Sequence, residues 1–245
     1  MSYFDDLSTD GLEESKDVLG GYSVYDSDVY KGKVKLAYAG KSKDGAKFVF
    51  LSIAMPDGKE YRETIYVTSK AGNNFYHPKG DTSKKVSLPG FVLANDISLL
   101  LSDKELRHQE FEDKVVNVYD PDHKKEMPKK VPVLVDLLGK DIAVGILKRL
   151  EDVTVKQGNE YVPTGKTRDT NAIDKIFHAE SMKTVSEYRD VKDEAEFVNK
   201  WLAKNKGTVR DLTKSEAKSG RPGAAAGGPP QAGTNAKPRA SLFGS

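Results

Sequence analysis

The chain has no cysteine, one tryptophan and four histidines, so several kinds of site are excluded at once. Without cysteine, neither a disulfide framework nor a thiolate metal site can form. The histidines are scattered and lack the HExxH spacing of a zinc hydrolase; they are His77, His108, His123 and His178. We therefore expect no bound metal and no cofactor.

Long apolar runs are also missing, and no stretch is long enough to span a bilayer. The opening residues, MSYFDDLSTDGLEES, are acidic and lack the apolar segment of a secretory signal. These absences predict a soluble protein of a reducing compartment with no membrane partner.

Catalytic motifs are equally scarce. Gly165-Lys166-Thr167 looks like the end of a phosphate-binding loop, but Glu160 stands where that motif needs a glycine. The segment 120–126, DPDHKKE, carries groups that a metal-dependent nuclease uses, yet it contains two lysines and no calcium-loop glycine. A solvated turn is the favoured interpretation of this segment, with a nuclease as the weaker alternative. The sequence predicts that the protein is not an enzyme.

The formal net charge is only +2, but the charges are unevenly placed. Residues 1–30 carry eight acidic groups and one lysine. Residues 31–206 carry 32 basic and 27 acidic groups, and residues 207–245 carry six basic and two acidic groups. Such asymmetry is typical of a chain with a polyanionic partner, although chance clustering on an ordinary solvated surface would produce it too.

Composition divides the chain into three parts. Residues 1–21 form an acidic arm that ends at two glycines, and we expect it to be flexible. Residues 207–245 are rich in Gly, Ala, Pro and Ser, which predicts a disordered basic tail. Residues 22–206 form the folded domain, which closes with an amphipathic helix over 192–206.

The first half of this domain is predicted to be a β-meander, with strands over 29–39, 46–55 and 59–68. In the first strand, Val34, Leu36 and Tyr38 share one face, opposite the lysines. In the other two strands, the residues predicted to face inward are Val49, Leu51, Ile53, Tyr61, Ile65 and Val67.

The remaining elements are shorter and more mixed. Residues 70–88 look like a long insertion, and the run at 91–101 has helical spacing. Further on we expect a strand at 114–119, a short helix near 131–138, and strands at 140–151 and 172–178 joined by a connection over 152–171. The fold class predicted is mainly β with added helices, arranged as a closed β-barrel like the oligonucleotide/oligosaccharide-binding (OB) fold.

An exposed aromatic and basic face follows from this strand periodicity. If the inward residues fill the barrel, the outward ones are Phe48, Phe50, Arg62 and Tyr66, joined by Lys33 and Lys35. Rings flanked by cations suit single-stranded nucleic acid, because bases stack on the rings while cations follow the phosphates. The alternative is that the two phenylalanines form a second core under the helix at 91–101.

Two loops and the insertion add to the same predicted surface. In an OB barrel the ligand crosses strands 2 and 3, between the first connecting loop and the last, which here are 40–47 and 152–171. The candidate residues of the first loop are Lys41, Lys43 and Lys47. Those of the last loop are Tyr161, Lys166 and Arg168, with Lys156 beside them. Those of the insertion are Phe75, Tyr76, Lys79, Lys84 and Lys85.

Several short sequence segments of the chain resemble those of one protein family. LSTDGLEES, KSKDGAKF, GKEYRETIYVT, LPGFVLAND, VPVLVDLLGK, VGILK, YVPTG and the terminal SLFG are similar to the single-stranded DNA-binding proteins of tailed bacteriophages, podoviruses in particular. The resemblance implies an OB-type fold and protection of single strands during replication, recombination and repair of viral DNA in the host cell cytoplasm. It also implies replication partners such as a DNA polymerase.

The two ends depart from the acidic tail that many such proteins carry. Here the head is acidic and contains Tyr3 and Phe4, while the basic tail ends near Leu242 and Phe243. We expect these four residues to bind protein partners. The alternative is that both ends are extensions that only increase solubility. A viral protein that contacts replication or transcription proteins without primarily binding DNA is the second functional hypothesis.

Overall fold

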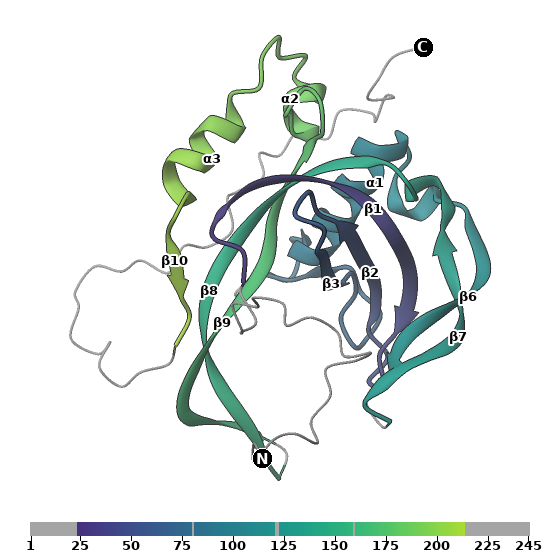
Figure 1. The fold of residues 1–245 in the computed structure, drawn as a ribbon, viewed down its shortest axis with the longest axis vertical. Helices are drawn as coiled ribbons and strands as arrows, with labels where there is room; N and C mark the ends of the chain where they lie inside the picture. The colour runs from purple at the N-terminus through teal and green to yellow at the C-terminus, as the bar shows by residue number, and fades with distance from the viewer. Residues whose placement is uncertain (1–23, 80, 121–122, 159, 214–245) are drawn as a thin grey trace, which may run out of the picture.

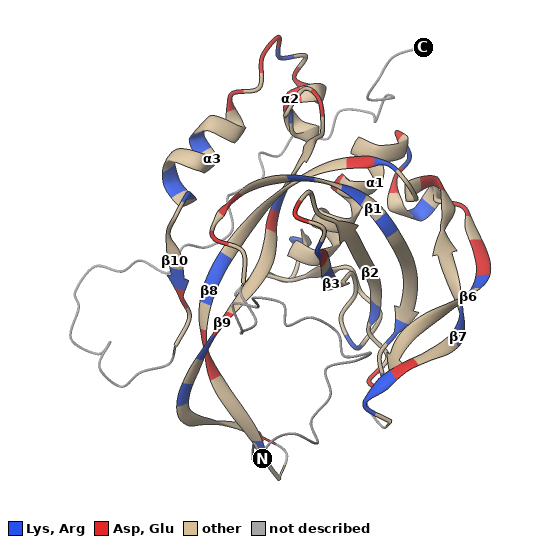
Figure 2. Cartoon of the chain, viewed as in Figure 1, with Lys and Arg blue, Asp and Glu red and all other residues tan. Residues whose placement is uncertain are grey.

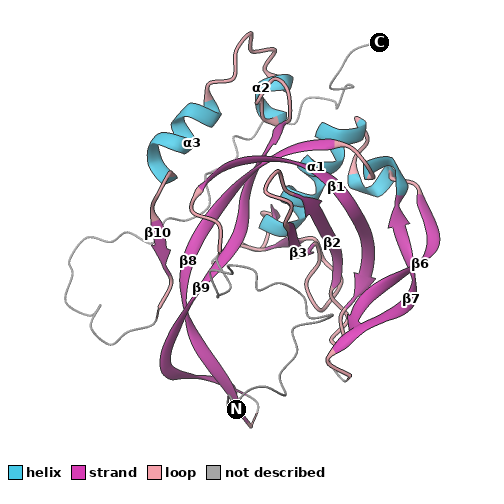
Figure 3. Cartoon of the chain, in the orientation of Figure 1, coloured by secondary structure: helices cyan, strands magenta, loops and turns pink. Residues whose placement is uncertain are grey.

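The computed structural model describes residues 24–79, 81–120, 123–158 and 160–213 (Figure 1). The protein is mainly β, with an eight-stranded sheet as its largest element and three short α-helices among the described residues (Figure 3). In the described part of the chain, no helix has the length and apolar character needed to cross a membrane.

The large sheet is built around a long first strand. Its central path runs β10-β8-β1-β2-β3, with β9 beside β8 and the β6–β7 hairpin attached to β1 through β7. The strands are β1 (Asp28–Lys41), β2 (Lys47–Ala54), β3 (Glu60–Tyr66), β6 (Phe111–Asp120), β7 (Lys125–Leu134), β8 (Asp141–Gln157), β9 (Glu160–His178) and β10 (Val209–Asp211). All pairs are antiparallel except β8 with β10.

The predicted meander is confirmed as β1–β2–β3, with one change of face. Val49, Leu51 and Ile53 lie in the main core as predicted. In β1, however, a register irregularity between Val34 and Leu36 separates residues that the sequence placed together. Val34 remains in the core, whereas Leu36 and Tyr38 lie in a different cluster on the other face, because an inserted residue reverses the alternation of side chains.

The predicted connection over 152–171 is wrong. Strands β8 and β9 continue through it as one long hairpin whose register runs out to Gln157 opposite Glu160 (Figure 1). Gly158 has a φ of 61° at the turn, where a residue with a side chain would be strained. The β-branched residues Thr154, Val155 and Val162 around a Gly-Asn pair are the hairpin signal in this segment.

The helices differ from prediction in two places. Helix α1 (Pro89–Ser102) contains the predicted 91–101 run. The predicted helix near 131–138 is wrong, because 131–134 belong to β7 and only Val135–Leu137 form a 3-10 turn. Helices α2 (Val185–Arg189) and α3 (Phe197–Asn205) follow β9, so the helix predicted over 192–206 begins later than expected.

The late start of α3 has a local cause. Glu187 accepts hydrogen bonds from the backbone N–H groups of Glu196 and Phe197, at 2.8 and 2.7 Å. These donors have no partner within the helix, so the carboxylate acts as a cap that fixes its first turn. The helix then packs Trp201 over Gly145 of β8, and the indole N–H donates to Asp174 at 2.7 Å.

The sheet is not closed into a barrel, which corrects the sequence-based expectation. Among the described residues, β3 pairs only with β2 and β9 only with β8. Helix α1 packs against both strands across this opening. Gly90 makes that approach possible, because a Cβ there would lie 2.1 Å from the carbonyl oxygen of Tyr66 at the end of β3.

The half-buried carboxylate of Glu63 links β3 and β9, which do not pair with each other. Glu63 of β3 accepts a hydrogen bond from the backbone N–H of Ile173 in β9 at 2.8 Å, and another from the Tyr61 hydroxyl at 2.7 Å. Burial raises the pKa of Glu63, while these hydrogen bonds and the charge of Arg149 oppose the rise.

The folded part extends slightly beyond the predicted boundary at 207. Strand β10 pairs parallel with β8, and Leu212 N–H donates to the Leu150 carbonyl at 2.9 Å. The start of the segment predicted to be disordered is therefore part of the sheet. The rest of that tail, and the arm over 1–21, lie outside the described residues.

Candidate nucleic-acid interface

Four aromatic side chains gather on the sheet face opposite the main core. The Tyr38 and Phe50 rings are stacked with centroids 4.8 Å apart. Phe48 meets Tyr38 and Tyr66 edge to face, at 6.4 and 5.9 Å. We call Tyr38, Phe48, Phe50 and Tyr66 the aromatic cluster. The sequence predicted three of its members, whereas Tyr38 was assigned to the core face because the bulge in β1 has no clear sequence signal.

Exposure within the cluster is graded. Tyr66 is 52% exposed, while Tyr38 is buried and both phenylalanines are half-buried. The ring of Phe48 lies across Gly40, where a Cβ would come within 2.3 Å of it. Only a glycine therefore lets this ring lie flat on β1.

The two phenylalanines do belong to a second apolar cluster, as the structural alternative predicted, but not under α1. Their neighbours are Val131 and Val133 of β7, whereas α1 packs on the main core. The aromatic cluster is thus partly covered by the β6–β7 hairpin and open at Tyr66. Tyr66 is the most exposed ring of the cluster, and the half-buried phenylalanines lie beside it.

The predicted cations at one end of this face are neutralised. Lys33 pairs with Asp141 at 2.8 Å, and Lys35 pairs with Glu60 at 2.7 Å. Arg62 pairs with Glu60 and also with Glu126 of β7. We call Lys33, Lys35 and Arg62 with their acidic partners the neutralised end.

Glu60 is the centre of this network. Hydrogen bonds, first from Arg62 and then from Lys35 and Ser52, lower its pKa to about 2 against the opposing effect of burial. The carboxylate is therefore ionised at neutral pH. Its charge leaves Lys35 and Arg62 poorly suited to attract phosphate.

The opposite end of β1 and β2 carries further cations, on the sheet face of Ala39 and Val49 rather than that of the aromatic cluster. Lys41 and Lys47 stand opposite each other in the β1–β2 register, next to Phe48. Both are exposed, and neither forms an ion pair with any residue that the structure describes. Lys43, in the turn between them, is also exposed.

The β8–β9 hairpin reaches the same end of the sheet. Asp44 of the β1–β2 turn pairs with Lys70 at 2.8 Å. The pKa of Asp44 is lowered mainly by Lys70 and further by the charge of Lys156 on β8, so the hairpin and the turn are electrostatic neighbours. The structure thereby brings together the first and last connections that the sequence singled out.

The outer half of this hairpin carries both basic and acidic groups (Figure 2). Tyr161 is 70% exposed and stands opposite Lys156 in the register. Lys156, Lys166 and Arg168 are exposed and form no ion pair within the described part of the chain. We call Lys41, Lys47, Tyr66, Lys156, Tyr161, Lys166 and Arg168 the loop end.

The insertion is a separate small hairpin of β4 (Phe75–Tyr76) and β5 (Val86–Ser87). Lys85 lies over the Phe75 ring, 4.6 Å from its centroid, and Lys84 pairs with Asp81 at 3.2 Å. Tyr76 is 38% exposed, and Lys79 is exposed too. These candidate residues have their contacts within the insertion, so they form a second basic-aromatic group beside the loop end.

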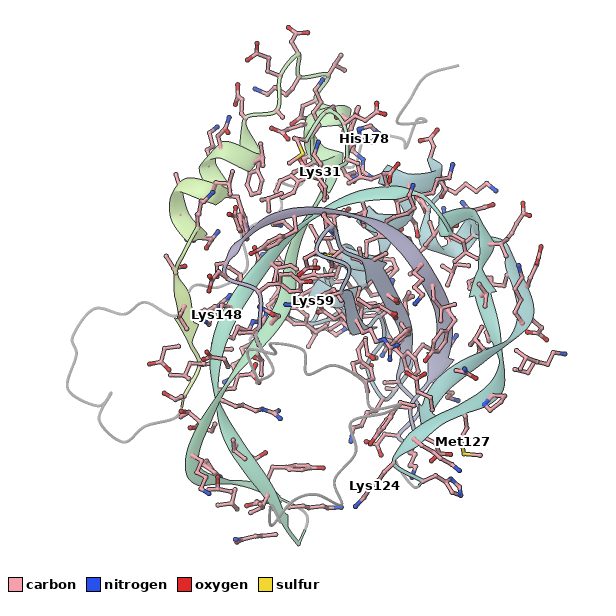
Figure 4. The ribbon with its side chains drawn as sticks, viewed as in Figure 1. Lys31, Lys59, Lys124, Met127, Lys148 and His178 are labelled. Carbon is pink, nitrogen blue, oxygen red and sulfur yellow. The ribbon has the colours of Figure 1, made fainter. Side chains whose placement is uncertain are left out.

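The β6–β7 hairpin contributes cations that sequence reasoning missed. Lys124, Lys125 and Lys129 are exposed and have no ion pair with described residues. Figure 4 labels Lys124 and Met127 at this hairpin's end. The run of lysines in HKKEMPKK was the available signal.

Side chains of the 120–126 segment that a metal-dependent nuclease would use form ion pairs instead. His123 pairs with Asp120 at 3.2 Å, and Glu126 holds Arg62. No group of three or more metal-binding side chains exists among the residues described. The predicted partner-binding residues Tyr3, Phe4, Leu242 and Phe243 lie outside the described residues.

Comparison with known proteins adds no assignment: no protein-family model and no curated protein matches the chain. The functional argument therefore rests on the residues of the chain and their arrangement.

Proposed function

We propose that this protein binds single-stranded DNA without regard to sequence, through the loop end and the aromatic cluster. The observation that carries the proposal is the gathering of unpaired cations and exposed rings from β1–β2, β3 and the β8–β9 hairpin at one end of the barrel. Such a surface suits a flexible polyanion with stackable bases, because cations follow the backbone and every base has a face to stack.

The strand order supports an OB-type barrel as the scaffold. Counting only the main strands, the order is β3-β2-β1-β8-β9, and a helix follows the third strand. An OB fold is a five-stranded, partly open barrel that binds oligonucleotides across strands 2 and 3 and between two loops. In this chain, those positions are the aromatic cluster, the β1–β2 turn and the β8–β9 hairpin.

The biological role that follows is protection of exposed strands in viral DNA replication, recombination and repair. It is supported by the resemblance of the chain's phrases to phage single-stranded DNA-binding proteins. A replication protein such as a DNA polymerase is the corresponding partner.

A salt titration of oligo-dT binding tests the proposal directly. The logarithm of affinity should fall linearly with the logarithm of salt concentration, with a slope of about −0.7 per phosphate neutralised. Mixed-sequence single strands should bind nearly as well, and duplex of equal length much more weakly. Salt-insensitive binding, or preference for duplex, would contradict the proposal. Failure to bind any DNA would favour the regulatory viral protein instead.

A further inference from the structure

Strands β2 and β3 carry three rings of the aromatic cluster but bring no unpaired cation to the same face. Their only cations are Lys47 and Arg62. Lys47 precedes Phe48 and therefore points to the opposite face. Arg62 shares the face of the rings but is paired with Glu60 and Glu126. If single-stranded DNA stacks on these rings, its phosphates need cations from another element.

The β6–β7 hairpin covers this face. Val116 and Val118 of β6 lie in the same apolar cluster as Phe48 and Phe50. Close to the end of the hairpin, Glu126 forms its ion pair with a side chain of β3, so the hairpin reaches across the face to that strand. In the chain it lies between α1 and β8, outside the two loops that bound the ligand of an OB fold.

The register of the hairpin places two lysines on its inner face, which is the face of the two valines. Lys129 stands opposite Val116, and Met127 stands opposite Val118. Directly opposite residues of an antiparallel pair have their side chains on the same side, so both point as the valines do. Lys125, two residues from Met127, follows by alternation. The inner face thus combines a half-buried thioether with two exposed lysines.

Neither inner lysine is held by an acidic group. Lys125 and Lys129 form no ion pair with any residue that the structure describes. Asp120 stands opposite Lys125 but pairs with His123, at 3.2 Å. The hairpin therefore offers its unpaired strand lysines on the side of the aromatic cluster, where the strands that carry the rings offer none.

We propose that the β6–β7 hairpin forms the second wall of the DNA site, so that the single strand runs between this hairpin and Tyr66. Bases stack on Tyr66 and pack against the Met127 thioether, a flexible group that packs well on rings. Lys125 and Lys129 contact the phosphates. Tyr66 also belongs to the loop end, so the strand continues from the hairpin to the cations there. The inference rests on the proposed function and adds that the DNA is enclosed from two sides.

Two adjacent lysines provide the first test, because Lys129 and Lys130 lie on opposite faces of β7. Lys130 stands opposite Val115 and pairs with Asp113 at 3.2 Å. Lys129→Glu should weaken oligo-dT binding about tenfold at low salt and reduce the salt slope by about 0.7. Lys130→Glu makes the same change of charge and should leave both quantities nearly unchanged.

The outcomes separate the inference from the function on which it rests. Equal losses for the two variants would overturn the second wall while the unchanged chain still binds DNA. An unchanged chain that does not bind oligo-dT would refute the proposed function, and the inference with it.

Thiol protection provides a second measurement that does not depend on charge. The chain has no cysteine, so Met127→Cys and Asn117→Cys variants each carry one thiol, on the inner and the outer face of the hairpin. Saturating oligo-dT should slow the reaction of the inner thiol with a maleimide several-fold, because the strand covers it, and leave the outer thiol unchanged. Equal protection of both thiols would overturn the inference. So would an inner thiol that reacts faster with DNA bound, since the hairpin would then move away from the strand.

Discussion

The neutralised end and the loop end lie at opposite ends of strands β1 and β2 and began as one predicted surface. At the neutralised end, Lys35 and Arg62 are held by Glu60. At the loop end, Lys41 and Lys47 form no ion pair with any described residue, and Asp44 in the turn between them pairs with Lys70. Both ends are rich in lysine and arginine, so composition does not distinguish them. The difference lies in the ion pairs that form at each end, and it is the reason why we propose phosphate binding at the loop end.

Charge reversal should produce the largest separation of the two ends. Lys41→Glu combined with Lys47→Glu should weaken oligo-dT binding on the order of 100-fold at low salt and reduce the salt slope by about 1.4. The matched control, Lys33→Glu with Lys35→Glu, changes the same number of charges at the neutralised end. Equal losses in fluorescence anisotropy titrations of the two variants would abolish the distinction.

Removal of rings should have the next largest effect. Phe48→Ala and Tyr66→Ala should each cost about 1–3 kcal/mol of binding if bases stack on them. Tyr66 is exposed, so its loss should change the free energy of unfolding by less than about 0.5 kcal/mol. Leu51→Ala in the main core should instead cost about 2–5 kcal/mol of stability. Binding isotherms and urea unfolding measure the two quantities. A destabilised Phe48→Ala protein that binds normally would make Phe48 purely structural.

Release of the neutralised end should give a smaller gain. Glu60→Gln removes the carboxylate that holds Lys35, so this cation becomes available to phosphate, while Arg62 keeps its ion pair with Glu126. Affinity for oligo-dT at low salt should rise a few-fold, with a slope steeper by about 0.7 for each new phosphate contact. Glu112→Gln, which removes a carboxylate of the β6–β7 hairpin, is the control. Unchanged affinity for Glu60→Gln would place this end away from the DNA path.

The pH dependence of stability should show the smallest effect. The pKa of Glu60 is lowered from 4.5 to about 2 in the folded protein. Its contribution to stability is therefore complete above pH 4.5 and is lost as the pH falls through 2. Urea unfolding at pH 5 and pH 3 should show a smaller decline for Glu60→Gln than for the unchanged chain. Identical declines would mean that the ion pairs add nothing to stability.

The strand alternation was sufficient to predict β1–β2–β3 and the outward placement of Phe48, Phe50 and Tyr66. It was not sufficient for Tyr38, because one inserted residue in β1 reverses the face. The ion pairs were out of reach for another reason. Glu126 meets Arg62 from 64 residues away, and no local pattern specifies such a partner. The prediction of a connection over 152–171 gave too little weight to the β-branched residues of that segment.

The opening of the sheet between β3 and β9 should also affect the rates of folding and unfolding. Glu63 and the Ile173 amide are separated by 110 residues, and their hydrogen bond links the two strands that no ladder joins. Forming this contact closes a long loop and costs much conformational entropy, whereas the hairpins on either side close short loops. The seam should therefore form after the folding transition state, so that a Glu63→Ala chain folds at nearly the normal rate and unfolds faster. We therefore expect the Glu63 carboxylate to set the unfolding rate, and with it the lifetime of the folded state.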